Sequence, residues 1–299
     1  MTTIDKIKIP FSYFGGKRRV APIVWQRFGK VSNYVEPFAG SLSVLLSNPN
    51  IPKIETVNEI NPFIVNFWRS VSFAPQEVAK YADYPVSEID LHARQKYLLS
   101  KKDLYLSLEN DISYFDAEIA GLWIYGQSLS VGDNWLKPKG EKAMPVLSSA
   151  GSGIIGLTYD IEEEFSKLCS RLKKVRIICG DWKRVVSPAI TYNNVGLGNK
   201  DITSIFLDPP YDLSNRDKVY DNDKPIYYDV CRWAIDNGNN CKMRIAVCGY
   251  ENDFIFPENW QVFAWEANGG MANLGESNGR KNKSRERIYF SPHCLKLSQ

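Results

Sequence analysis

Short apolar runs alternate with helix-like segments in the first part of the chain. Residues 31–36 (VSNYVE) and 53–60 (KIETVNEI) have the alternation and the β-branched residues that predict strands. The segments SLSVLLS (41–47) and PFIVNFWRSV (62–71) have the apolar spacing of helices. This order of strand, loop, helix, strand and helix, with short connections, predicts a parallel α/β sheet.

The pattern changes in the middle of the chain. SEIDLHARQKYLLS (87–100) and SYFDAEIAGLWIYGQ (113–127) predict helices, and a stretch rich in glycine, proline and serine without a clear period follows them. We therefore expect an inserted, mixed helical and loop region at 75–170 within an α/β body formed by 1–74 and 171–299.

The sheet pattern returns in the last part of the chain. A helix is expected at PIYYDVCRWAIDNG (225–238). Strands are expected in VRIICGDW (175–182), ITSIFLDPPY (202–211), KMRIAVCGY (242–250), WQVFAWEA (260–267) and RERIYFSP (285–292).

Composition narrows the class of protein. A hydrophobic content of 44% with 24% charged residues is ordinary for a soluble globular chain. No apolar run is long enough for a membrane span, and the N-terminus lacks the apolar core of a signal peptide, so we expect a cytoplasmic protein. The six cysteines form no CxxC pair and there are only two histidines, which argues against a zinc site and a disulfide framework.

Charge is concentrated near the C-terminus. The segment RKNKSRER (280–287) carries five positive residues and one negative, or +4, which leaves about −1 of the net +3 for the rest of the chain. A basic loop on a nearly neutral body suits phosphate binding, and a solvated loop without a partner is an equally open alternative.

The end of ITSIFLDPPY is the most informative motif. An apolar strand runs directly into Asp208, Pro209, Pro210 and Tyr211. Proline lacks an N–H and has a fixed φ, so two in succession turn the chain into a stiff, extended corner. Asp208 and a neighbouring carbonyl could accept hydrogen bonds from the amino group of a planar substrate, while Tyr211 stacks on its ring.

Three further motifs accompany it. FSYFGGK (11–17) has two glycines that allow close backbone approach and a lysine beside them, although it lacks P-loop spacing and a structural turn is the alternative. VEPFAGS (35–41) lies after a strand, where open α/β sheets bind cofactors. In VNEIN (57–61), Glu59 could accept hydrogen bonds from a ribose diol or stabilise a helix N-terminus.

Together these motifs resemble those of the Dam-type (D12 class, alpha-group) DNA adenine-N6 methyltransferases. FSYFGGK, VEPFAGS and LDPPY occur in this order, with a long insertion before LDPPY, and the resemblance covers about 10–70 and 175–292. It implies an α/β fold with a Rossmann-like, S-adenosylmethionine-dependent methyltransferase sheet. The insertion 75–170 would be a mostly helical target-recognition domain that binds DNA.

The resemblance also implies roles for individual residues. Asp208, Pro209, Pro210 and Tyr211 would form the catalytic motif. Tyr13 stands where the family often has Trp, and Glu59 stands where it more often has Asp, which puts the ribose contact distance in question. The implied cofactor contacts are Tyr13, Gly15, Gly16, Lys17, Glu36, Pro37, Phe38, Ala39, Gly40, Ser41, Glu59, Asp181, Trp182 and Asp208.

The expected DNA contacts lie in the insertion and in the basic segment. Aromatic, amide and hydroxyl side chains could read or intercalate between bases, and cationic ones could bind phosphate. For Trp123 and Tyr125, a place in the protein core is an equally open alternative. The residues expected to contact DNA are Trp123, Tyr125, Gln127, Ser128, Trp135, Lys137, Lys139, Arg280, Lys281, Lys283 and Arg285.

The implied reaction is direct methyl transfer from S-adenosylmethionine to an adenine flipped out of duplex DNA, without a metal. We expect a monomer in a bacterial or phage-infected cell, with dimerisation on DNA and a cognate restriction enzyme as open alternatives. A GATC-like target is an analogy only.

Other functions also need to be compared with this pattern of motifs. A cytosine-N4 or RNA adenine methyltransferase would share this fold, and a non-catalytic nucleic-acid-binding relative would retain it. A dinucleotide oxidoreductase is disfavoured because GxGxxG is missing after the first strand.

Overall fold

The computed structural model describes residues 7–11, 16–130, 135–136, 144–145, 160–210, 223–265 and 285–297, without the side chains of 223–225. The chain forms two compact units. The first comprises Met1–Gly16, Gly40–Leu46 and Glu59–Cys179, and the second comprises Lys17–Ala39, Ser47–Asn58 and Gly180–Gln299.

The second unit contains a mixed sheet in which strands run in the order β2-β1-β4-β5-β7-β6. Neighbours among β2, β1, β4 and β5 are parallel, whereas β7 is antiparallel to β5 and β6 is antiparallel to β7. The strands are β1 (Asn33–Glu36), β2 (Ile54–Glu59, whose last residue falls in the first unit), β4 (Thr203–Leu207), β5 (Met243–Tyr250), β6 (Gln261–Ala264) and β7 (Glu286–Phe290).

Burial follows position in this sheet. Every residue of β4 is buried, as expected for a central parallel strand covered on both faces. The edge strand β6 instead alternates between half-buried and exposed residues. Because β1, β4 and β5 are parallel, their carboxyl ends lie at one edge of the sheet.

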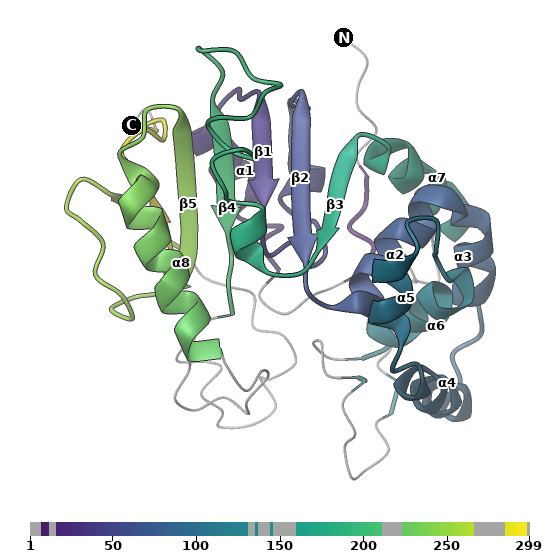
Figure 1. The fold of residues 1–299 in the computed structure, drawn as a ribbon. Coiled ribbons are helices and arrows are strands. Elements are labelled where there is room, and N and C mark those ends of the chain that lie inside the picture. The colour runs from purple at the N-terminus through teal and green to yellow at the C-terminus, as the bar shows by residue number, and fades with distance from the viewer. Residues whose placement is uncertain are drawn as a thin grey trace. The chain divides into compact units, whose positions relative to one another are not determined.

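In the part of the second unit that the structure describes, two α-helices and a short 3₁₀-helix accompany the sheet. They are α1 (Ala21–Phe28), η2 (Trp182–Arg184) and α8 (Asp223–Gly238). A proline stands in the first turn of α1, and Gly29 ends this helix with a φ of 60°. Buried Tyr227, Val230, Cys231 and Ala234 follow a helical period along α8, which packs against β5 (Figure 1).

The first unit is mainly helical. Side chains of Asn61, Ser87, Asp116 and Asp160 cap four of its helices by accepting a hydrogen bond from a first-turn backbone N–H. Figure 1 shows the helices of this unit grouped together. The elements of the unit are η1 (Leu45–Ser47), α2 (Pro62–Phe73), α3 (Pro75–Ala82), α4 (Glu88–Ser100), α5 (Leu104–Asn110), α6 (Ala117–Ser128), α7 (Ile161–Leu172) and β3 (Val175–Cys179).

An aromatic cluster forms the core of this helical unit. Phe11 packs edge-on against Trp123 at 5.0 Å between ring centroids and against Phe67 at 5.8 Å. Trp68 and Phe165 also contact Phe67, at 5.0 and 5.7 Å. Such pairs stabilise a core beyond the area that they bury. The cluster ties the segment preceding Lys17 in sequence to α2, α6 and α7.

Most of the expected elements are confirmed, and one is wrong. The segment 41–47 forms turns and the short 3₁₀-helix η1 because Leu42 adopts a φ of 57° and Pro49 follows closely. Helices α1, α3, α5 and α7 were not expected.

The compact units also divide the chain differently from the expected boundaries at 74 and 170. Compactness does not test which segment recognises DNA, so the recognition role of 75–170 stays a prediction.

Candidate functional site

An ion pair joins two residues that the sequence singles out. Lys17 Nζ lies 2.9 Å from Asp208 Oδ1, at the carboxyl end of β4. The Lys17 side chain is 3% exposed and that of Asp208 is 19% exposed, so the cation is enclosed while the acid remains partly accessible. Pro209 is buried and Pro210 half-buried. The stiff corner expected after β4 therefore holds an oriented carboxylate.

Lys17 stays protonated in this enclosed position. Burial alone would lower the pKa of Lys17, but the charge of Asp208 and weaker contributions from Cys248 and Glu286 raise it above its ordinary value. The Lys17 ammonium also lies 5.7 Å from the centroid of the Trp265 ring, within cation–π range. Asp208 is thus accompanied by a permanent cation.

The loop after β1 begins with a buried acid. Glu36 is 2% exposed, and its Oε2 accepts a hydrogen bond of 2.9 Å from the hydroxyl of Tyr34. Burial, followed by the proximity of Glu36, raises the pKa of the Tyr34 phenol, which keeps this donor protonated. Glu36 is therefore already held by one protein donor within the second unit.

Asn58 on β2 bridges two loops of the second unit. Its side-chain nitrogen donates to the carbonyls of Pro37 and Gly180, each at 3.0 Å. Its own backbone carbonyl accepts from the N–H of Ala39, also at 3.0 Å. The loop after β1 and the segment Gly180–Trp182 are consequently fixed to the same residue.

The segment Gly180–Trp182 has a defined local conformation. Gly180 has a φ of 142°, which side-chain-bearing residues rarely adopt. Asp181 Oδ1 accepts a 2.7 Å hydrogen bond from the N–H of Lys183 and so caps η2. Trp182 packs against Phe38 at 6.0 Å between ring centroids. The predicted cofactor residues Phe38 and Trp182 are therefore in contact.

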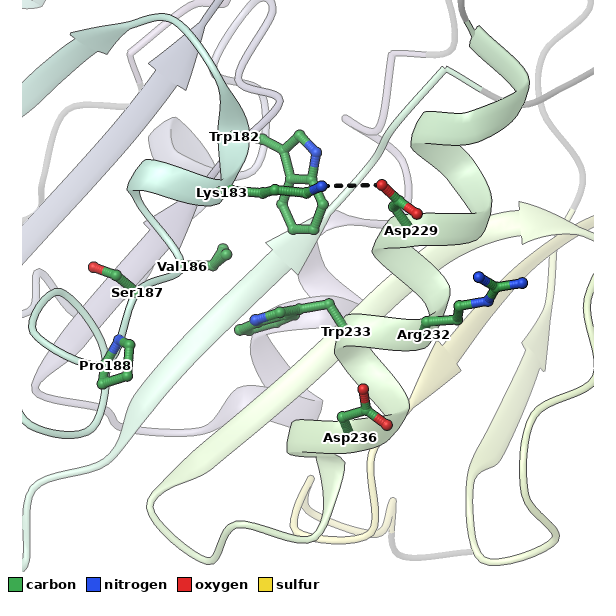
Figure 2. A pocket seen from close by; sticks show the side chains of 9 residues that line it. All are labelled: Trp182, Lys183, Val186, Ser187, Pro188, Asp229, Arg232, Trp233 and Asp236. Carbon is green, nitrogen blue, oxygen red and sulfur yellow. Dashed lines mark hydrogen bonds and ion pairs between the residues drawn. The ribbon is translucent and has the colours of Figure 1, made fainter.

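An open depression of about 390 Å³ is lined in part by Trp182 of this segment. Figure 2 shows the Lys183–Asp229 ion pair beside Trp182, and Trp233 on α8 below it. Neither Lys17 nor Asp208 lines this depression, so it is distinct from the surroundings of the predicted catalytic acid. Its lining residues are Trp182, Lys183, Val186, Ser187, Pro188, Asp229, Arg232, Trp233 and Asp236.

Glu59, in the first unit, is engaged by backbone donors. Its Oε1 accepts from the N–H groups of Ile60 and Asn61, at 2.8 and 3.1 Å, and its Oε2 accepts from that of Gly40 at 3.0 Å. The first two bonds lie at the start of α2, which fits the alternative that Glu59 stabilises the N-terminus of this helix. Gly40 has a φ of 47°, and its carbonyl accepts from the Trp68 indole at 3.3 Å. Ser41 beside it is buried.

Most described residues expected to contact DNA lie in the core of the helical unit. Trp123 and Tyr125 on α6 are 2% and 0% exposed, which corresponds to the core alternative rather than to intercalation. Gln127, Ser128 and Trp135 are also buried, which disfavours a direct base contact by any of them in this conformation. In the second unit, Arg285 is in an ion pair with Asp253 at 2.8 Å.

Several predicted residues lie outside the described part of the chain, while Gly16 is described and exposed. Those outside it are Tyr13, Gly15, Lys137, Lys139, Tyr211, Arg280, Lys281 and Lys283.

Sequence reasoning missed the contacts made by Asn58 and Trp265. No local pattern singles out Asn58, because Glu55, Thr56 and Glu59 on the same strand are polar as well. No local pattern points to Trp265, which approaches Lys17 from a distant part of the sequence.

No cluster of three or more His, Cys, Asp or Glu side chains suited to a metal occurs in the described ranges. The same residues include no helix long and apolar enough to cross a membrane. None of the six cysteines, all of which lie in the described ranges, forms a disulfide.

Comparison with known protein families confirms the resemblance seen in the motifs. A family model described as D12 class N6 adenine-specific DNA methyltransferase matches residues 13–229, well over half of the 299 residues. This range contains Lys17, Asn58, Glu59 and Asp208. A comparison with curated proteins finds no match. The mixed α/β fold and the family match agree, and the chain belongs to the D12 class of N6 adenine-specific DNA methyltransferases.

Proposed function

We propose that the protein transfers the methyl group of S-adenosylmethionine to the exocyclic amine of adenine in double-stranded DNA. The observation that carries this proposal is the Lys17–Asp208 ion pair, 2.9 Å long, at the carboxyl end of β4. Parallel α/β sheets bind their ligands at this edge. The family match supports adenine in DNA as the acceptor.

The residues of the second unit suit this cofactor chemically. S-adenosylmethionine supplies an electrophilic methyl group, and it carries an adenine ring, a ribose diol, an ammonium and a sulfonium. Glu36, Asp181 and Asp208 offer carboxylates, and Phe38 and Trp182 offer aromatic faces.

The other cofactor assignments have different kinds of support. Gly180 adopts a conformation suited to close backbone approach, and Pro37 and Ala39 belong to the fixed loop after β1. Gly40, Ser41 and Glu59 in the first unit remain cofactor contacts proposed from the sequence, together with Tyr13, Gly15 and Gly16.

Asp208 is the proposed hydrogen-bond acceptor for the amino group of the target base. The lone pair of this nitrogen is delocalised into the ring, which makes it a poor nucleophile. Donation of its N–H bonds to Asp208 and to the Pro209 carbonyl favours a tetrahedral nitrogen with an available lone pair. Lys17 fixes the direction of the Asp208 carboxylate, so catalysis rests on positioning and electrostatics without a covalent enzyme intermediate.

The target adenine must leave the duplex before Asp208 can reach it. Unstacking costs a few kcal/mol, and stacking on the side chain of Tyr211 offsets part of this cost in the proposed complex. Pro210 fixes the chain direction between Asp208 and Tyr211.

DNA recognition is assigned to the insertion 75–170 and to the basic segment. Because the described aromatic residues of α6 are buried, we place the contacts on Lys137, Lys139 and the segment 280–287 rather than on Trp123 or Tyr125. A GATC-like target, a monomer that can pair on DNA, and a cognate restriction enzyme are part of the same proposal by analogy with the family.

Methyl transfer from labelled S-adenosylmethionine to unmethylated DNA tests this function. Asp208→Asn keeps the shape but removes the charge, and we expect transfer to fall by a factor of about 100 or more, as for other oriented groups at reacting centres. Asp201→Asn is the matched control, because Asp201 precedes the same strand at its opposite end and should leave transfer unchanged. Equal activity of the two variants would contradict the role of Asp208.

A further inference from the structure

Asn58 occupies a buried position between two loops that carry predicted cofactor residues. It is 2% exposed and donates one hydrogen bond to Pro37 and one to Gly180. We propose that Asn58 is a positioning residue, which sets the separation of these loops and thereby shapes the site for S-adenosylmethionine. This inference rests on the proposed function.

The chemistry of its neighbours fixes the orientation of the Asn58 amide. Pro37 and Gly180 both present backbone carbonyls, which only accept hydrogen bonds, so the NH₂ group must face them. Neither serine, leucine nor aspartate can supply two N–H donors from this position. Among the described residues, Asn58 Oδ1 has no hydrogen-bond partner. The contribution of the Asn58 side chain to the loops therefore resides in its two donors.

These two bonds hold the backbone next to two aromatic rings, Phe38 and Trp182. Pro37 precedes Phe38, and Gly180 lies two residues before Trp182; the two rings pack at 6.0 Å. The third bond, from Ala39 N–H to the Asn58 carbonyl, fixes the loop after β1 independently of the side chain. Loss of the Asn58 amide would release the Gly180 carbonyl and shift Asp181 and Trp182 with it.

Asn33 provides a matched control. It is 0% exposed, and its amide also makes two donor bonds, to the Ile190 carbonyl at 2.9 Å and to the Thr203 hydroxyl at 3.1 Å. Asn33 Oδ1 likewise lacks a partner within the described residues. Asn33 lies at the amino end of β1, however, away from both loops. The two asparagines are thus equally buried and each donates two hydrogen bonds, but only Asn58 donates to the loops that carry predicted cofactor residues.

Steady-state kinetics of four variants separates positioning from packing. Asn58→Asp places acceptor oxygens against two carbonyls, and Asn58→Ser retains at most one donor and is the milder change if the aspartate variant does not fold. Asn33→Asp and Asn33→Ser are the corresponding controls. For each variant we would measure KM for S-adenosylmethionine, KM for DNA, kcat and Tm. Hydrogen exchange of the peptides containing 37–41 and 180–184 would be followed as well.

We expect both Asn58 variants to raise KM for S-adenosylmethionine about 10-fold or more, because Asn58→Asp loses both buried hydrogen bonds and Asn58→Ser loses at least one. KM for DNA should stay within about 2-fold. Exchange should increase in the segment 180–184 and less in 37–41, where the Ala39–Asn58 backbone bond remains. The Asn33 variants should lower Tm similarly without changing either KM.

Unchanged KM for S-adenosylmethionine in Asn58→Ser, with a lowered Tm, would overturn the inference and leave a packing role. An inactive wild-type protein would instead overturn the proposed function, and the inference with it.

Discussion

The Lys17–Asp208 ion pair should contribute to the free energy of unfolding, and substitution of Lys17 tests this. Replacing Lys17 by Met keeps the length and the apolar stem of the side chain but removes its charge. Asp208 then retains a carboxylate whose side chain is only 19% exposed and whose partner at 2.9 Å is gone. The cation–π contact between the Lys17 ammonium and the Trp265 ring is lost at the same time.

Breaking a fully buried ion pair from one side costs about 3–5 kcal/mol. Asp208 keeps some contact with water, so we expect Lys17→Met to lower the free energy of unfolding by about 2–4 kcal/mol and Tm by roughly 5–10 °C. Because the pKa of Lys17 is raised on folding, its contribution to stability is fully present below the ordinary lysine pKa and is lost only above the raised value. The difference between wild type and variant should therefore be constant from about pH 6 to 9.

A double-mutant cycle measures the coupling. Urea unfolding of wild type, Lys17→Met, Asp208→Asn and the double variant should give a coupling of about 1–3 kcal/mol, because removal of both charges leaves no isolated one. The exposed pair Lys183–Asp229, at 3.0 Å, is the control and should show no coupling beyond experimental error. Additivity of the Lys17 and Asp208 changes within about 0.5 kcal/mol would refute the reasoning.

Three further outcomes follow from local geometry. A hydrogen bond from Ser32, followed by weaker partners, lowers the pKa of Asp201 to about 2. The contribution of Asp201 to the stability of the fold should therefore persist above about pH 4 and disappear as pH falls toward 2. Unfolding of Asp201→Asn, followed as the pH is lowered, should lack this dependence. Gly126→Ala would place a Cβ atom 2.3 Å from the Trp135 ring, and calorimetry should show a loss of about 1–3 kcal/mol. Gly180→Ala introduces a strained φ and should raise KM for S-adenosylmethionine, whereas unchanged KM would show that this loop does not shape the cofactor site.

Local sequence patterns predicted the strands and the loops that follow them. Strand β4 and the acid after it were evident because a buried parallel strand is a continuous apolar run and two prolines must end it. The same reasoning failed at 41–47, where apolar spacing suggested a helix. Leu42 adopts a positive φ there, and backbone conformation of this kind leaves no mark on hydrophobic periodicity.

Tertiary contacts explain what the sequence could not predict about the site. Lys17 and Asp208 were each selected from separate motifs, but their pairing depends on the packing of segments far apart in the chain. Ribose binding by Glu59 stays a prediction, whereas its bonds to the N–H groups of Ile60 and Asn61 hold the backbone just before α2. The contacts of Asn58 could not be predicted, because folding brings together the two carbonyls to which its side chain donates.

The identity of the methylated nucleoside tests the central claim most directly. Unmethylated DNA is incubated with the protein and S-adenosylmethionine, digested to nucleosides and analysed by mass spectrometry. We predict N6-methyladenine with the wild-type protein and none with Asp208→Ala. N4-methylcytosine as the product, or no methylated nucleoside from any DNA, would contradict the account.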